Sequence, residues 1–411
     1  MSNNWYSSVL PIFLKGVATV TSGTIILKMA MFSLNAAFAR ATETEDAANI
    51  AKIIAFGFAL SVVLHFSSTR FIARTALQGD RNGARLALRI ALGLIVASLI
   101  FIEFLGYVFS NEKLTNSLFL STLFMAGSVA LFDLSTSLAN ALGSNKTAAI
   151  GQSAMGTAIA ICAFGTLSNA PTFPDAAIVI IPFTALATAF VVLWSLKEQL
   201  REPATYPITR PLHLVLQLRN LLHFSLPGLI GTICINPLVL WTVSSVAGIT
   251  GQEFVIFLVC QNLLGLAMLL PGQMNTAAFS ILAKNSLSQQ AGYLVLYLSL
   301  GSAIISILAV YFLLPFAKPV YGDAFEKVYS AAPWFIAAAV PFVLIQFIAT
   351  KMFLIGRPWA EAVANVAFGI MFITGCYLLP PSSFELAAIA LLLFTCHLVR
   401  AAILFVTYKY Y

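Results

Sequence analysis

Charged residues are scarce in this sequence: only 9% of its 411 residues are Asp, Glu, Lys or Arg, whereas 60% are hydrophobic. Soluble proteins carry about 25% charged residues, so this chain has too little charge to cover a water-facing surface of its size. We therefore expect a polytopic membrane protein. Long apolar runs without two-residue alternation favour membrane-spanning helices, which need about 20 residues each.

The sequence also lacks the features of metal, redox and enzyme sites. Its cysteines all lie inside apolar segments without CxxC spacing, at Cys162, Cys234, Cys260, Cys376 and Cys396. Cysteines in such a pattern usually serve as small buried side chains. No P-loop, no paired membrane aspartates and no large loop on one side are present. We predict no metal, no cofactor and no enzymatic activity.

Two further absences concern the partners and the N-terminus. The net charge is +7, but no basic cluster is interleaved with aromatic residues, so we expect no nucleic acid. The excess charge instead indicates loops that face anionic membrane lipid. The N-terminal run MSNNWYSSVLPIFLKG lacks a basic region and a small-residue cleavage site, which predicts that the first helix is retained as an anchor.

One long polar run divides the chain. Residues 197–220, KEQLREPATYPITRPLHLVLQLRN, contain four cations and three prolines. This pattern predicts a cytoplasmic linker between two pseudo-symmetric six-helix lobes, residues 1–196 and 221–411, in an all-α fold. The apolar runs place the helices at 12–38, 50–66, 88–109, 114–142, 148–167, 176–196, 221–246, 254–282, 292–316, 331–355, 360–379 and 386–408.

Loop charges predict the orientation, because cytoplasmic loops are enriched in Lys and Arg. One set of loops holds most of the cations, namely Arg70, Arg74, Arg81, Arg85, Lys146, Lys197, Arg201, Arg210, Arg219, Lys284, Arg357 and Lys409. The opposite set holds Arg40, Lys113, Lys318 and Lys327. We expect both termini to be cytoplasmic.

Charged residues inside the apolar runs are the candidate functional residues, because burying one costs about 2.5–3.5 kcal/mol on insertion scales. Lys28 lies deep in the first helix and Arg400 deep in the last. Lys15 lies near a helix end, where it can also reach the interface. We interpret these three as cations of a wet central cavity; a structural ion pair is the alternative for Lys28. His397, three positions before Arg400, favours a helix contact.

Acidic and amide residues form a second group of candidates. Asp133, with Ser137 and Asn140 on the same helix face, indicates either a site for a coupling proton or sodium ion or an ion pair. Glu103 is the other candidate acid. Sugar-binding or interhelical amides are found at Asn236, Gln261 and Asn262. Pro227, Pro237 and Pro271 predict breaks in the seventh and eighth helices.

The order of helices and loops, together with short local runs, resembles a known family. The runs are Ala39-Arg40, the segment STRFIAR at 68–74, the segment VYGDAF at 320–325 and the segment IGRP at 355–358. With them the chain resembles the Wzx-type polysaccharide flippases of the multidrug, oligosaccharidyl-lipid and polysaccharide exporter superfamily.

The resemblance implies that the chain moves a polyprenyl-pyrophosphate-linked oligosaccharide, such as an O-antigen repeat unit, across the bacterial inner membrane by alternating access. Implied partners are this lipid-linked substrate, membrane lipid, a polysaccharide polymerase and chain-length proteins. Two alternatives remain open: a cation-coupled multidrug antiporter of the same superfamily, and a membrane-embedded glycan polymerase. The polymerase is disfavoured because the chain lacks a large outer loop.

Overall fold

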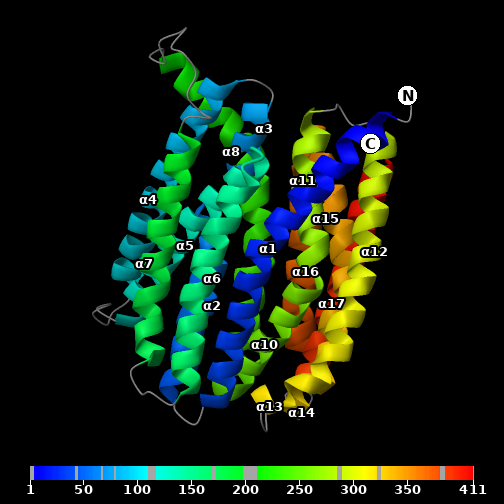
Figure 1. Ribbon diagram of the computed structural model, residues 1–411. Helices are drawn as coiled ribbons and strands as arrows, with labels where there is room; N and C mark the ends of the chain where they lie inside the picture. Colours follow the sequence, from blue (N-terminus) through cyan, green and yellow to red (C-terminus); the bar gives the residue numbers. More distant parts are fainter. Residues whose placement is uncertain are drawn as a thin grey trace.

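The computed structural model describes residues 4–41, 45–65, 68–77, 80–109, 117–168, 173–197, 211–284, 289–321, 325–379 and 385–410, and these residues form helices and short turns without any strand. Figure 1 shows the helices running side by side in two groups. Eleven of them are long and apolar enough to cross a membrane, or twelve if one bent pair counts as a span. The predicted all-α, polytopic membrane fold is confirmed.

In sequence order the first helices are α1(Asn4–Ala41), α2(Glu45–Leu64), α3(Ser68–Leu77), α4(Arg81–Phe109), α5(Ser117–Ala141), α6(Asn145–Leu167) and α7(Phe173–Leu196). After the linker follow α8(Pro211–Ile233), α9(Asn236–Trp241), the π-turn η1(Thr242–Val246), α10(Gly251–Ala267), α11(Leu269–Lys284), α12(Gln289–Leu313), the 3-10 turn η2(Leu314–Ala317), α13(Lys318–Tyr321), α14(Phe325–Ala337), α15(Ala339–Leu354), α16(Trp359–Leu378) and α17(Leu386–Lys409). We call residues 4–197 the first half and residues 211–410 the second half.

The linker prediction meets the structure only in part. Residues 198–210 lie outside the described residues, as do Arg201, Arg210 and Lys113 of the loop-charge argument. The remainder of the expected linker is largely helical, because α8 begins at Pro211. Proline fits the first turn of a helix, where its missing N–H leaves no bond unmade. The division into two six-helix lobes stays a prediction.

The basic loop expected after the second helix is instead a short helix, α3, followed directly by α4. Phe71 and Ile72 are buried on one side of α3, whereas Arg70 and Arg74 are only half-buried. This amphipathic pattern favours a helix at the level of the membrane surface. The prediction of a loop was wrong because it counted charges and not the spacing of the apolar residues.

Two of the three predicted proline breaks are present. The chain leaves helix at Cys234–Ile235, just before Pro237, because proline has no N–H to bond the carbonyl four residues earlier and its ring clashes with that carbonyl. The pair α10–α11, with Pro271 in its second helix, bends by 53°. Pro227 lies inside the continuous helix α8, so the predicted break there was wrong.

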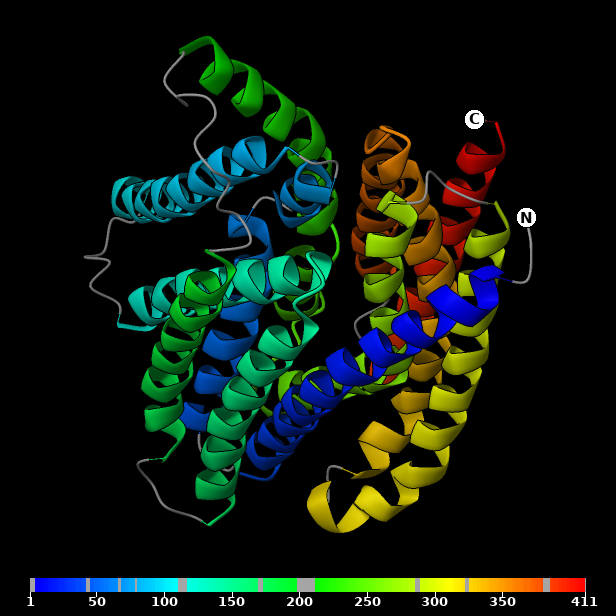
Figure 2. The same cartoon turned by 45° about the horizontal axis from the view of Figure 1, so that its top comes forward.

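The two halves pack together at one end of the molecule, where α1 ends and α10 and α14 begin (Figure 1). Phe32 of α1 meets Tyr321 edge-on with ring centroids 5.5 Å apart. Phe56 of α2 stacks on Phe254 of α10 at 6.4 Å. We call these contacts between the two halves the aromatic seam. Figure 2, tilted from the first view, shows α1 crossing between the two groups of helices.

Large apolar side chains also cover the outside of the bundle. Phe164, Trp194 and Phe316 are among the exposed ones. Such a surface is unfavourable in water but is the surface that lipid requires. The exposed apolar residues and the long apolar helices together make the chain a multi-pass membrane protein.

Close packing of α1 on α6 depends on glycine. A Cβ atom added at Gly156 would lie 2.8 Å from the backbone nitrogen of Leu27, and one added at Gly23 would lie 2.6 Å from the backbone of Ala149. Without a hydrophobic force between helices in lipid, such close backbone approach supplies much of the association.

Replacing Gly156 with valine is therefore expected to separate α1 from α6. Overpacking of this kind costs about 1–3 kcal/mol, which should appear as a lower Tm of the purified protein in detergent. Gly93→Val is the matched control, because nothing lies within 4 Å of a Cβ at Gly93. Equal Tm values for the two variants would contradict the packing account.

Candidate functional site

A cavity of about 590 Å³ lies between the two halves, and we call it the central cavity. Apolar residues of both halves form much of its wall, including Met31, Phe58, Leu240 and Phe335. Its polar lining residues are Thr24, Lys28, Asn35, Asp133, Asn236, Gln261, Asn262, Gln273, Thr276, Gln346 and His397. A largely apolar wall with scattered polar groups is typical of sites for small organic molecules.

Lys28 projects into the central cavity from the middle of α1. Its Nζ lies 3.6 Å from where a Cβ of Gly265 in α10 would be, so the ammonium group reaches the second half. The ion pairs within 4.0 Å in the described part of the chain do not include Lys28. Because an unpaired ammonium is unstable in hydrocarbon, the cavity around it requires water or a bound solute.

Asp133 of α5 lines the same cavity. The hydroxyl of Ser61 in α2 donates a hydrogen bond of 3.2 Å to its Oδ2. Asp133 and Lys28 attract each other electrostatically, although they form no direct ion pair within 4.0 Å among the described residues. Apart from His397, the titratable lining residues are one lysine and one aspartate. Their opposite charges leave the cavity close to electrically balanced.

A second cavity of about 310 Å³, which we call the vestibule, adjoins the central cavity and shares Val62 and Thr276 with it. Its walls come from helix ends, including the ends of α2, α5 and α15 and the start of α16. Hydroxyl and amide groups are frequent in it, at Thr69, Ser137, Thr232, Asn275, Thr276 and Thr350. The vestibule therefore connects the central cavity towards the end of the bundle that lies opposite the aromatic seam.

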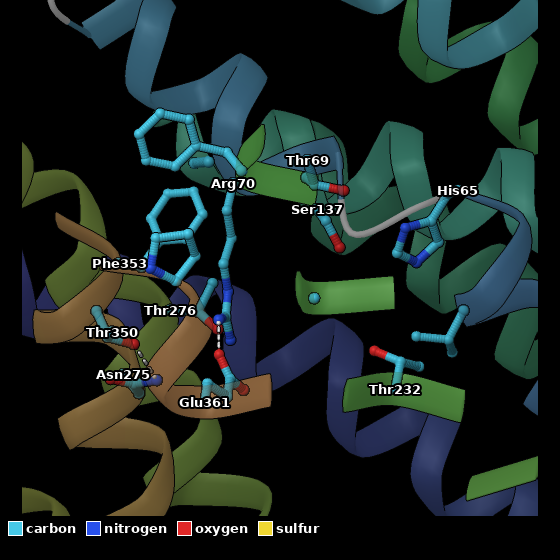
Figure 3. Close-up of a pocket in the computed structure, with 15 residues that line it drawn as sticks. His65, Thr69, Arg70, Ser137, Thr232, Asn275, Thr276, Thr350, Phe353 and Glu361 are labelled. Atoms are coloured by element: carbon cyan, nitrogen blue, oxygen red, sulfur yellow. Dashed lines mark hydrogen bonds and ion pairs between the residues drawn. The ribbon is translucent and has the colours of Figure 1, made fainter. Parts of the chain in front are cut away.

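Figure 3 shows the vestibule with Arg70 pointing from α3 to Glu361 of α16. Their side chains form an ion pair with an N–O distance of 3.0 Å. Nearby, Asn275 donates a hydrogen bond of 3.2 Å to the hydroxyl of Thr350. Burial lowers the pKa of His65, just beyond α2, to about 4, so its imidazole is neutral at pH 7.

The structure brings five of the predicted site residues into the central cavity: Lys28, Asp133, Asn236, Gln261 and Asn262. They come from α1, α5, α9 and α10. Ser137, on the same helix face as Asp133, lines the vestibule, so this polar face of α5 runs from one cavity to the other.

Three predicted residues line neither cavity: Lys15, Glu103 and Arg400. Lys15 and Glu103 are exposed, which fits charged residues that reach the polar surface from near a helix end. Arg400 is buried, at 2% exposure. Its guanidinium lies over the rings of Phe342 and Phe368, at 5.4 and 5.9 Å from their centroids.

His397 lies between the cavity and this aromatic group. Its ring stacks on Phe368 with centroids 4.6 Å apart and meets Phe342 at 5.0 Å. These contacts agree with the expected helix-contact role of this histidine, although one face of it also lines the central cavity.

Sequence reasoning missed several polar residues of the site. Gln273 and Gln346 line the central cavity and carry the same signal as Gln261, an amide in an apolar helix. Outside both cavities, sequence reasoning also missed Lys351, which is buried in α15 against the rings of Phe347 and Tyr408. Its position inside an apolar run could have indicated it. No local signal identifies the Arg70–Glu361 pair, whose members are 291 positions apart.

Comparisons with known proteins identify the fold. No protein-family model matches the chain, and no curated protein matches its sequence. The chain is similar to the solved Vibrio cholerae MATE transporter VcmN in its bent form, with 12% identity over 99% of this chain and 98% of that chain and a TM-score of 0.70.

Two other solved structures are similar over nearly the whole length. One is an outward-facing multidrug resistance MATE family transporter of the MOP superfamily, with 15% identity, coverage of 96% and 95%, and a TM-score of 0.70. The other is a MOP superfamily transporter from Pyrococcus furiosus, described by the reverse polarity of its binding pocket, with 14% identity, coverage of 96% and 97%, and a TM-score of 0.67. This chain has the fold of these MATE transporters.

The central cavity predicts which positions of α10 react with a water-soluble thiol reagent. In a variant without the native cysteines, Gln261→Cys should react readily, because Gln261 faces the cavity. Val259→Cys, two positions away and fully buried, should react at least about tenfold more slowly, because a buried thiol is inert. Mass spectrometry of the labelled protein measures both rates, and similar rates would contradict a water-filled cavity.

Proposed function

We propose that this chain is a membrane transporter that works by alternating access and exchanges an organic solute for a coupling cation across the membrane. The single observation that carries this proposal is that the central cavity holds both a cation and a carboxylate. Asp133 and Lys28 line one space between the halves without a direct ion pair in the described part of the chain. Asp133 is therefore available to a proton or sodium ion.

Cavity size and chemistry support a drug-sized, amphipathic solute. Ligand pockets for such molecules have volumes of about 300–1,000 Å³, and the central cavity has about 590 Å³. Its amide groups, such as Gln261 and Gln346, can orient a polar group while Phe335 and Phe342 contact an apolar body. A multidrug resistance transporter of the same fold supports the same choice.

Unequal closure of the two ends supports alternating access. The aromatic seam closes one end of the interface, whereas the vestibule and the central cavity adjoin each other towards the opposite end. A rocking motion of the halves that opens one end while the other end stays closed would carry a bound solute from one side of the membrane to the other. In the state described here the central cavity adjoins the vestibule, and the Arg70–Glu361 ion pair joins the halves at the vestibule end.

The vestibule side is proposed to be cytoplasmic, in a bacterial inner membrane. Arg70, Arg81 and Lys146 belong to helix ends or loops on this side, and positive loops favour the cytoplasm. In Figure 1, α1 begins and α17 ends at this same end of the bundle, so both termini would be cytoplasmic.

A second candidate is the flipping of a lipid-linked oligosaccharide, which the resemblance to polysaccharide flippases implies. Lys28 favours it, because an ammonium group without a carboxylate within 4.0 Å in the described residues can hold a phosphate. Arg400, the other expected phosphate contact, lines neither cavity. A single cavity lysine opposed by Asp133 gives weaker support for a doubly charged pyrophosphate than for a solute of low net charge.

Transport by the purified protein in proteoliposomes tests the proposal. A fluorescent cationic dye should be exchanged in response to an imposed proton or sodium gradient. Asp133→Asn should reduce the gradient-driven rate at least about tenfold, because an amide cannot take up a coupling proton. Asp175→Asn, at an exposed helix start, is the matched control and should retain the wild-type rate.

A second assay in the same proteoliposomes tests the flippase alternative. A polyprenyl-pyrophosphate-linked fluorescent oligosaccharide should stay in its leaflet if the antiporter proposal is right. Movement of this lipid that is lost in Lys28→Met, together with absence of dye exchange, would replace the antiporter with the flippase. Dye exchange that persists unchanged in Asp133→Asn would contradict the coupling role of this aspartate.

A further inference from the structure

The Arg70–Glu361 ion pair connects the two halves at the vestibule (Figure 3). Arg70 belongs to α3 of the first half and Glu361 to the first turn of α16 in the second half. Among the described residues, the other two ion pairs within 4.0 Å both lie inside the second half. The halves are thus joined by an ion pair at the end opposite the aromatic seam, across a cavity that has to change shape during transport.

This ion pair is suited to breaking and re-forming. The side chains of Arg70 and Glu361 are 38% and 20% exposed, so water and salt screen their attraction. Partly exposed pairs of this kind shift an equilibrium by no more than about fivefold. The contact can therefore bias the position of the halves without locking them.

Arg400 of α17, unlike Arg70, has no carboxylate within 4.0 Å among the described residues. As a whole residue it is 2% exposed, and its Nε and one terminal nitrogen have no hydrogen-bond partner in the described part of the chain. Faces of Phe342 and Phe368 offset part of this cost. A buried guanidinium is nevertheless far more stable beside a carboxylate, so Arg400 has a partner still to gain.

Glu361 is the carboxylate that can supply it. Helices α16 and α17 pack against each other and run in opposite directions. Glu361 precedes Leu378 of α16 by 17 residues, about 25 Å of helix, and Arg400 follows Leu386 of α17 by 14 residues, about 21 Å. The two therefore lie at nearly the same height on adjacent helices, and Glu361 attracts Arg400 electrostatically.

We infer that Glu361 is a switch that changes partners: it pairs with Arg70 when the halves are joined at the vestibule and with Arg400 when they move apart there. The exchange keeps the carboxylate paired in both states and relieves the unpartnered guanidinium in one of them. Arg70 thereby favours the joined state and Arg400 the separated state. This inference rests on the alternating access of the proposed function. It adds the residues that set the equilibrium between the joined and the separated state.

Distances between two spin labels measure this balance directly. The labels are placed at Lys146→Cys and Lys409→Cys, exposed positions at the vestibule end of the first and second half. The five native cysteines are replaced with alanine, and the protein is studied in lipid nanodiscs without solute by pulsed electron paramagnetic resonance. The quantity compared is the ratio of long to short label distances.

Three variants with a neutral side chain distinguish a partner exchange by Glu361 from an Arg70–Glu361 pair that only holds the halves together. Arg70→Gln should raise the ratio of long to short distances about two- to fivefold, and Arg400→Gln should lower it by a similar factor. Glu361→Gln removes both pairings, so its ratio should lie between those two. Arg400→Lys keeps the charge and should stay near the wild-type ratio. A shift in the same direction for Arg70→Gln and Arg400→Gln, or no shift in either, would overturn the inference.

A charge exchange covers the case in which Arg400→Gln does not fold, as judged by size-exclusion chromatography. The double variant Arg70→Glu with Glu361→Arg restores the pair across the vestibule but sets a cation beside Arg400. The inference expects this variant to stay far from the wild-type ratio, whereas recovery of that ratio would refute it. Because no solute is present, absent dye transport with the expected ratios would contradict the proposed function alone.

Discussion

Every charged group that this chain carries into the membrane requires water or a partner, because hydrocarbon offers neither. Lys28 and Asp133 form no ion pair within 4.0 Å among the described residues, yet both lie at membrane depth in α1 and α5. The cavity between the halves resolves this conflict, because it gives both side chains a polar space. The arrangement of the two halves around that space, and the role proposed for it, depend on this requirement.

The two ends of the interface are held by different kinds of contact. Aromatic rings such as Phe56 and Phe254 close one end, where separation would expose apolar surface to water. The vestibule end is joined by the partly exposed Arg70–Glu361 pair, which water can replace at little cost. A transporter that rocks between two states needs closures that can open again. At the vestibule end, an exchangeable ion pair meets that need with two residues.

Much of the fold could be predicted from the sequence, because long apolar runs and the charges of the loops identify membrane-spanning helices. The helix α3 could not be found this way, since its ten residues are too short and too polar for a spanning segment. Polar residues within apolar runs indicated Lys28, Asp133 and Gln261, and the structure places them in one cavity. The same signal did not separate a cavity cation from Arg400, which is buried against aromatic rings, because periodicity does not tell which neighbour a helix face meets. The Arg70–Glu361 pair is created only by the packing of distant helices.

The central claim is that water or a solute, and not lipid, surrounds Lys28 between two separable halves. A structure determined by electron cryomicroscopy in lipid nanodiscs tests it most directly. The account predicts a cavity that is continuous with the vestibule, with ordered water or solute density at the ammonium group of Lys28. Acyl-chain density around Lys28, or halves that meet along their whole length without a cavity, would contradict it.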